Sequence, residues 1–517
     1  MSLAKQTLAS AAGLSLLTAS IACNDDDPPP EPQPEPEVEI FPLPESLPFE
    51  LTRPAAGNAP SAAEISAFTT KITGLWKQVD YFRWCSWHSH GLHPSYDSAM
   101  PDYQLWWQDT AAVKEGDTIT FRHTGGADNI MIRTPKVMNQ AIGGYLSSDD
   151  PIMGQLVAGY AKGTTALFQA MVWGNGVPAT ESIMARAIFT HNHSYETADG
   201  RQIAVDYDPV KVEKYDWNAH TVPNPQNPYF GSIWVRNMRS KDDVPHIFRS
   251  YPLLLRVVQD TSDESVRAAA QDAVDHLRAF AVDIVDHGYK IRTVEDGEAY
   301  VPTEDLASFV QYDALIPNAE CNAKLAAALM GKRRPLDNDC GAGIHSAYEV
   351  VAVDIHYFNL AIIRYFHLAA ITNALTVGEN AIAQSMLDGL VERADVMMAD
   401  TEMALDHSEW NADTASFLLA AAASGLPMTG AEARVVQEQY GAAADHYAAW
   451  THWDLWDSSV PDGEYEYRPP RADAEATYVR PEELTYLLEY CYSPWRNPAT
   501  VALVDCDIVL DPSRWGT

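Results

Sequence analysis

After the N-terminal region, apolar residues recur at three- and four-residue spacings, which is the pattern of helices that bury one face. The clearest case is the stretch 265–287. Thr261 and Glu264 form a capping-box pattern before it and Gly288 follows it, so both ends of this helix are marked. The spacing predicts about twelve helices in total, near residues 63–80, 133–146, 151–173, 179–190, 244–259, 265–287, 319–331, 345–375, 378–402, 408–424, 430–449 and 481–491.

Strand patterns are confined to short pieces. Residues 116–121 and 129–132 predict a hairpin that turns at Gly125-Gly126, and residues 289–292 predict one more short strand. Neither piece is long enough to organise the fold. Two longer segments, near 191–241 and 454–480, show no periodicity, and the first is too rich in aromatic residues for disorder. We therefore expect two long ordered loops, a kind of segment that often carries function.

The predicted helix 345–375 is apolar on nearly all sides except for one polar stripe. The stripe contains Glu349, His356 and His367. Such a helix fits the inner wall of a helical toroid, where the stripe would line a wet channel, and it fits equally well a core helix whose polar groups are hydrogen-bonded. Glu349 and His367 lie about 27 Å apart along the helix, so they cannot share one site.

The N-terminus predicts export. Residues 1–22 contain one early cation, Lys5, and an apolar stretch that ends in small residues, as a signal peptide does. Ser20-Ile21-Ala22-Cys23 resembles a bacterial lipoprotein box with lipidation at Cys23, although ordinary cleavage after Ala22 also fits. Residues 23–60 form an acidic, proline-rich tether, and 61–517 form a single body with loop insertions near 191–241 and 454–480. We expect a lipid-anchored outer-membrane protein of a bacterium, at the periplasmic or cell surface, with membrane contact only through the lipid.

Charge narrows the choice of partners. The 517 residues include 71 acidic and 35 basic side chains, for a formal net charge of −36. Because phosphate binding needs clustered lysine and arginine, this excess of carboxylates argues against a broad nucleic-acid surface. We expect no nucleic-acid partner.

The cysteines fit an oxidising compartment. Cys321 and Cys340 are 19 residues apart, and Cys491 and Cys506 are 15 apart, so each pair could close a local disulfide loop. Cys85 is then left as a thiol, and other pairings stay open.

The number of helices, the short connections and the long aromatic loops resemble the (α/α)6 toroid of six-hairpin glycosidases and related polysaccharide lyases. The segment 234–243, Trp-Val-Arg-Asn-Met-Arg-Ser-Lys-Asp-Asp, is similar to the loop-to-inner-helix junctions where such enzymes place catalytic acids. The resemblance implies an all-α toroid with minor β-hairpins and long loops, and cleavage of a carbohydrate substrate.

The first candidates for chemistry are therefore the carboxylates of Asp242 and Asp243. Glycoside hydrolysis needs two carboxyl groups on either side of the scissile bond, and adjacent residues rarely supply both. We expect the second from Glu349 or Asp454. Capping of the following helix is the structural alternative. Cations next to the pair could bind substrate, namely Arg236, Arg239 and Lys241.

Aromatic side chains suit the flat faces of sugar rings. The stretch 450–457 alternates tryptophans with Asp454 and Asp457, and core packing explains the tryptophans equally well. The expected substrate-binding set combines indoles with one histidine of the polar stripe, namely Trp217, Trp234, Trp453 and His356.

Histidines offer a different chemistry. His88 with His90 and His191 with His193 are spaced so that each pair lies on one side of a strand, where it could bind Zn²⁺ and activate water. Asp337-Asn338-Asp339 could hold a structural Ca²⁺. The glycan-cleaving reaction needs no cofactor. Three functions stay open: a glycan-cleaving enzyme, which leads, a zinc hydrolase, and a non-catalytic surface lipoprotein that binds a glycan or a protein.

Overall fold

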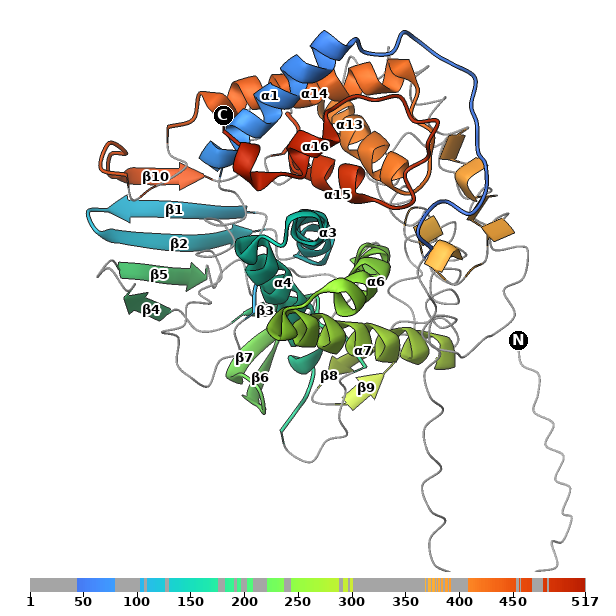
Figure 1. Cartoon of the computed structure of the whole chain (residues 1–517). Coiled ribbons are helices and arrows are strands. Elements are labelled where there is room, and N and C mark those ends of the chain that lie inside the picture. The colour runs from blue at the N-terminus through green and yellow to red at the C-terminus, as the bar shows by residue number, and fades with distance from the viewer. Residues whose placement is uncertain are drawn as a thin grey trace, which may run out of the picture. The chain divides into compact units, whose positions relative to one another are not determined.

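The structure is a computed structural model of the whole chain (Figure 1). The residues described are 44–79, 103–106, 109–125, 130–174, 182–189, 193–196, 202–207, 221–236, 243–287, 292–295, 298–300, part of 368–391, 408–451, 455, 457–466, 478–480 and 483–516.

Four helices form a first group in which each packs against two others. They are α3 (Ile130–Ser148), α4 (Pro151–Gln169), α6 (Asp243–Asp260) and α7 (Glu264–Asp286), and α4 packs on α7, α7 on α6, α6 on α3 and α3 on α4 (Figure 1). The predicted helix 265–287 is confirmed as α7, but its cap differs. The Asp263 carboxylate, rather than Thr261, accepts the backbone N–H groups of Ser265 and Val266, at 2.8 and 3.2 Å.

A second group contains the helices of the two ends of the chain. It consists of α1 (Ala62–Val79), α13 (Ser408–Ala423), α14 (Gly430–Ala448), α15 (Tyr486–Tyr492), α16 (Cys506–Val509) and the 3₁₀ turn η4 (Pro512–Arg514). α14 packs on α1 and α13, while α15 packs on α13 and also on α3 of the first group. Because α15 contacts both groups, side chains on this short helix reach residues that are far apart in the sequence.

The residues before α1 belong to this second group as well. The backbone of Ala56 accepts a hydrogen bond from the N–H of Ala431 at 2.8 Å, at the start of α14. Gly57 has a positive φ of 69°, and a Cβ there would lie 2.7 Å from the Ala431 nitrogen. Only glycine allows the chain to approach α14 so closely at this position.

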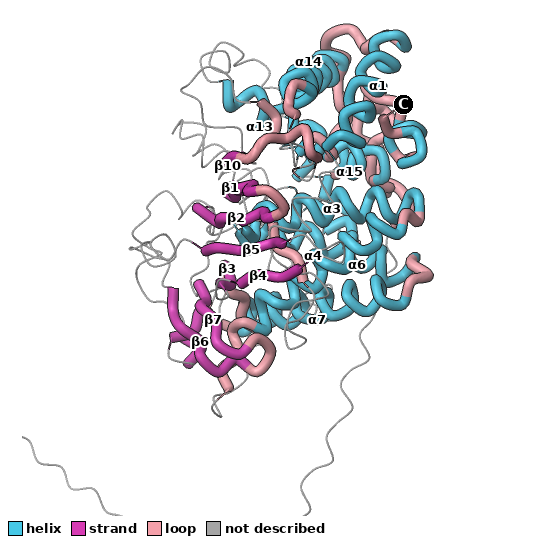
Figure 2. The backbone as a smooth tube through the Cα atoms, turned by 90° about the vertical axis from the view of Figure 1, so that its left-hand side faces the viewer, coloured by secondary structure: helices cyan, strands magenta, loops and turns pink. Residues whose placement is uncertain are grey.

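In the part of the chain that the structure describes, ten strands form three sheets. β1 (Asp109–Glu115), β2 (Thr118–Gly125), β5 (Gln202–Tyr207), β4 (His193–Glu196) and β10 (Gly463–Glu466) make a five-stranded sheet in the order β10-β1-β2-β5-β4 (Figure 2). In it β2 and β5 are parallel and the other pairs are antiparallel. β3 (Ala187–Phe189), β7 (Gly231–Arg236) and β6 (Thr221–Asn227) form an antiparallel sheet, and β8 (Thr293–Glu295) pairs with β9 (Glu298–Tyr300).

The expected all-α toroid is therefore wrong, because the fold mixes helices with sheets that cross large distances in the sequence. Four strands lie in 191–241, which we expected to be a loop, and β3 lies where we expected a helix over 179–190. Residues 130–132 begin α3 instead of pairing with β2, whose antiparallel partner is β1. The expected helices 319–331 and most of 345–375 lie outside the described residues.

Buried apolar residues of both helix groups and of the sheets belong to one continuous core. In the described part of the chain no helix is both long and apolar enough to cross a membrane.

Candidate functional site

A buried carboxylate stands where the two helix groups meet. Glu483, with only 2% of its side chain exposed, accepts from Arg133 Nη1 at 3.0 Å and lies 3.4 Å from Lys136 Nζ, both on α3. Ser416 Oγ of α13 donates to its other oxygen at 3.1 Å, and the Tyr440 hydroxyl of α14 donates to its backbone carbonyl at 3.0 Å. Burial opposes ionisation of Glu483, but Lys136, Arg133 and Ser416 outweigh it and hold the pKa of this carboxyl below its usual value. Glu483 is therefore a carboxylate at neutral pH.

A second buried carboxyl follows on α15. Arg249 of α6 donates to both oxygens of Glu489, through Nη2 to Oε1 and through Nη1 to Oε2, the latter at 3.4 Å. The two side chains are 4% and 7% exposed. Burial raises the pKa of Glu489, and the nearby guanidinium of Arg249 offsets only part of this rise. The pKa values of Glu483 and Glu489, which belong to one short segment, are thus shifted in opposite directions.

His246 lies one helical turn before Arg249, on the same face of α6. The imidazole is fully buried, and its pKa is lowered well below the usual value by burial and then by the positive charges of Lys136, Arg133 and Arg249. His246 is therefore neutral at pH 7. A neutral imidazole can donate one hydrogen bond and accept another among groups that are otherwise charged.

A small pocket opens beside the Arg249–Glu489 pair, with room for about one water molecule. Helices α6 and α15 each place two of its residues at helical spacing, Arg249 with Leu253 and Glu489 with Tyr492. The rest of the lining comes from other segments, namely Thr372, Ala423, Ser424, Ser493 and Trp495.

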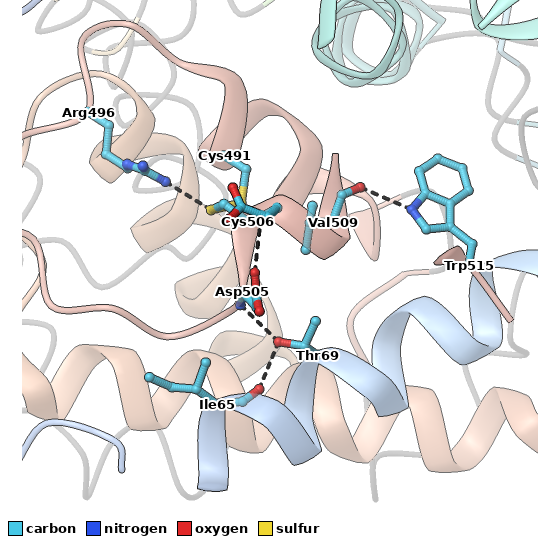
Figure 3. Close-up of a disulfide and its surroundings, with 9 residues drawn as sticks. Ile65, Thr69, Cys491, Arg496, Asp505, Cys506, Val509 and Trp515 are labelled. Carbon is cyan, nitrogen blue, oxygen red and sulfur yellow. Dashed lines mark hydrogen bonds between the residues drawn. A yellow bond between two sulfur atoms is a disulfide. The ribbon is translucent and has the colours of Figure 1, made fainter. Parts of the chain in front are cut away.

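The disulfide expected between Cys491 and Cys506 is confirmed, with a Cα–Cα distance of 5.2 Å (Figure 3). It ties the end of α15 to α16. Close by, Arg496 Nη1 lies 3.0 Å from the Cys506 sulfur, and Thr69 of α1 accepts the backbone N–H of Asp505 at 2.9 Å (Figure 3). The helix that carries Glu489 is thus fixed covalently to the C-terminal segment, which is itself hydrogen-bonded to α1.

Of the candidate catalytic, substrate-binding and metal-binding residues, four lie in described strands or helices. Asp243 is the first residue of α6 and His193 the first of β4. Trp234 of β7 is half-buried. Arg236, at the end of the same strand, is fully buried with its guanidinium 5.9 Å from the centre of the Phe189 ring.

The other predicted residues lie outside the described part of the chain. They are Asp242, Glu349, Asp454, Trp217, Arg239, Lys241, His356, Trp453, His88, His90, His191, Cys23, Cys321, Cys340 and the segment 337–339.

Sequence reasoning missed the residues that the structure brings together in the pocket region. The sequence feature that could have indicated them is a single charged residue within an apolar run. Glu489 lies between Leu488 and Tyr490, and Arg249 follows Ile247 and Phe248. Such charges are rarely buried unless they are paired, so each predicts a partner without saying which residue it is.

The described residues contain no group of three or more histidine, cysteine, aspartate or glutamate side chains arranged to hold a metal ion. Comparison of the chain with known proteins found no matching family model, no matching curated protein and no matching solved structure.

Proposed function

We propose that the chain is an exported enzyme that cleaves a glycan through two carboxyl groups, with Glu489 as the proton donor. The observation that supports this most is the buried carboxyl group of Glu489, whose pKa is raised by burial although Arg249 donates to both of its oxygens. Enzymes that use a carboxyl group as a general acid raise its pKa by burial in this way. Glu489 also lines a small pocket, where its carboxyl group can contact a water molecule.

The second reacting carboxylate is best sought at the start of α6. Glu483 is already bonded to Arg133, Lys136 and Ser416, which suits a positioning role. Asp243 is the first residue of α6, the helix that also carries Arg249, the partner of Glu489. Enzymes that leave room for water between the two carboxyl groups hold them about 6.5 to 9.5 Å apart. Asp242, Asp243, Glu349 and Asp454 therefore remain the proposed partners.

In this reaction the proton of Glu489 passes to the glycosidic oxygen while the bond between that oxygen and the anomeric carbon breaks. Water attacks the anomeric carbon from the other side, and the second carboxylate takes the proton that the water loses. Arg249 holds Glu489 in place, and its positive charge then stabilises the carboxylate that remains.

A depolymerisation screen on the purified mature protein, read by the release of reducing ends, tests the proposal. We expect Glu489→Gln to lower the rate by about 10²- to 10⁴-fold, the usual contribution of a general acid. Glu438→Gln, at an exposed position of α14, is the matched control and should keep full activity.

Equal activity of Glu489→Gln and the wild type would refute the assignment. Glycan binding without cleavage would favour a non-catalytic binding protein. Stoichiometric zinc, with activity lost in His88→Ala and His191→Ala, would favour the metal hydrolase.

A further inference from the structure

The two sulfur atoms of the Cys491–Cys506 disulfide have different surroundings (Figure 3). Cys491, near the C-terminal end of α15, is only 7% exposed, whereas Cys506, the first residue of α16, is half-buried. Arg496 Nη1 lies 3.0 Å from the Cys506 sulfur. A thiol that approaches from solvent therefore meets Cys506 first, beside a positive charge that attracts its thiolate form.

The charge of Arg496 has no carboxylate partner among the residues that the structure describes. Its guanidinium carbon lies 5.1 Å from the centre of the Tyr490 ring. Burial raises the pKa of Tyr490, and Arg496 offsets only part of this rise, so the phenol stays neutral well above pH 7. The guanidinium thus contacts a neutral ring and a neutral disulfide, and a thiolate at Cys506 would give it an anionic partner.

We propose that the Cys491–Cys506 disulfide is a redox switch that exchanges with thiol reductants at Cys506, with Arg496 stabilising the thiolate that is released. A nearby cation favours a thiolate over a thiol, and a disulfide whose reduced form is stabilised in this way is reduced more readily. Reduction removes the covalent link between α15 and α16, two residues after Glu489. The switch thus acts on the helix that carries Glu489, whether or not the protein cleaves a glycan.

The exchange takes two steps. The thiolate of a reductant attacks the Cys506 sulfur, the S–S bond breaks, and its electron pair goes to the Cys491 sulfur, which takes up a proton. A second reductant thiolate then attacks the reductant sulfur of this mixed disulfide, so that Cys506 leaves as a thiolate beside Arg496. The two reductant thiols are oxidised to one disulfide, and the protein disulfide gains their two electrons. Of their two protons, one stays on Cys491 and the other goes to water.

Equilibration of the full mature protein with mixtures of reduced and oxidised glutathione at pH 8 tests the switch. After acid quenching and alkylation, mass spectrometry gives the reduced fraction of this disulfide. We expect the wild type to be reduced within the range of these mixtures, which structural disulfides resist. Arg496→Gln removes the charge, so its equilibrium constant for reduction should be about tenfold smaller. Arg514→Gln, at an exposed position of η4, is the matched control and should behave like the wild type.

The variant Cys491→Ala leaves Cys506 as a free thiol and reports on its thiolate directly. At pH 7 this thiol should react with iodoacetamide about fivefold faster than the same thiol in the double variant that also carries Arg496→Gln. If Cys491→Ala does not fold, the glutathione equilibria of Arg496→Gln and Arg514→Gln decide.

Amide hydrogen exchange in α15 measures the structural consequence. Reduction should speed this exchange in the wild type, whereas glutathione should leave it unchanged in the double variant with Cys491→Ala and Cys506→Ala. A wild-type disulfide that stays oxidised in reduced glutathione, or equal equilibrium constants for Arg496→Gln and the wild type, would overturn the switch. Reduction that leaves the exchange in α15 unchanged would overturn it as well.

Discussion

A buried ion pair holds the residues before α1 on the helix group that carries α15. Arg53 Nη1 lies 2.9 Å from both carboxylate oxygens of Glu432 and donates to the carbonyl of Pro427 at 2.9 Å. The two side chains are only 3% and 1% exposed. Glu432 also closes the capping box of α14 by accepting the backbone N–H of Thr429 at 2.8 Å.

Removing one partner of such a pair leaves the other charge buried and unpaired. Arg53→Met and Glu432→Gln should each lower the free energy of unfolding by about 3 to 5 kcal/mol. The double variant leaves neither charge behind, so its loss should be close to that of one single variant. The coupling energy between the two residues is then about 3 kcal/mol or more.

Urea unfolding of the four proteins, followed by circular dichroism, measures this coupling. The exposed pair Lys71–Asp445, with side chains 42% and 68% exposed, is the control, and its cycle should give at most about 1 kcal/mol. A coupling below about 1 kcal/mol for Arg53 and Glu432 would show that their burial does not make the pair strong.

Three further predictions concern a buried histidine, the disulfide and a close-packed glycine. The pKa of His246 is lowered from 6.5, so the unfolded chain takes up the proton before the folded protein does, and the stability that neutral His246 contributes is complete above pH 6.5 and lost as the pH falls. Below pH 6.5 the wild type should lose about 1.4 kcal/mol of unfolding free energy per pH unit relative to His246→Gln, measured by urea titrations. Replacing Cys491 and Cys506 by alanine should lower stability by about 3 kcal/mol, read as a lower melting temperature that reducing agent does not lower further. Gly163→Ala would place a Cβ 1.8 Å from a backbone carbonyl oxygen and should lower the free energy of unfolding by about 3 kcal/mol or more in urea titrations. The control is Gly74→Ala, where nothing lies within 4 Å of the added Cβ, and it should not destabilise the protein.

Helices were predictable because their pattern is local. The stretches that became α1, α4, α7 and α14 each carry enough turns of 3.6-residue periodicity to reveal the buried face within one window. The sheets were not predictable, because their pairing is not local. β1 pairs with β10 near the other end of the chain and β2 pairs in parallel with β5, so no sequence window contains both strands of either pair.

The burial and the partners of charged residues were also not predictable from local sequence. Arg236 was interpreted as a substrate-binding cation because other charges follow it in the sequence, but the register of β7 with β3 and β6 buries it completely. Glu489 and Arg249 lie far apart in the sequence, and only the packing of α15 and α6 on α3 brings them together. A pattern of residues predicts that a buried charge needs a partner, and tertiary structure chooses it.

The most direct test of this account is the protonation of Glu489. Carbon-13 NMR of carboxyl-labelled glutamate, with the signal assigned by its loss in Glu489→Gln, follows the titration of this one group. We predict that its pKa lies above the usual 4.5, so that Glu489 keeps a proton to donate where ordinary glutamates have lost theirs. A titration at or below 4.5 would make Glu489 an ordinary ion-pair partner of Arg249 and would contradict its role as the proton donor.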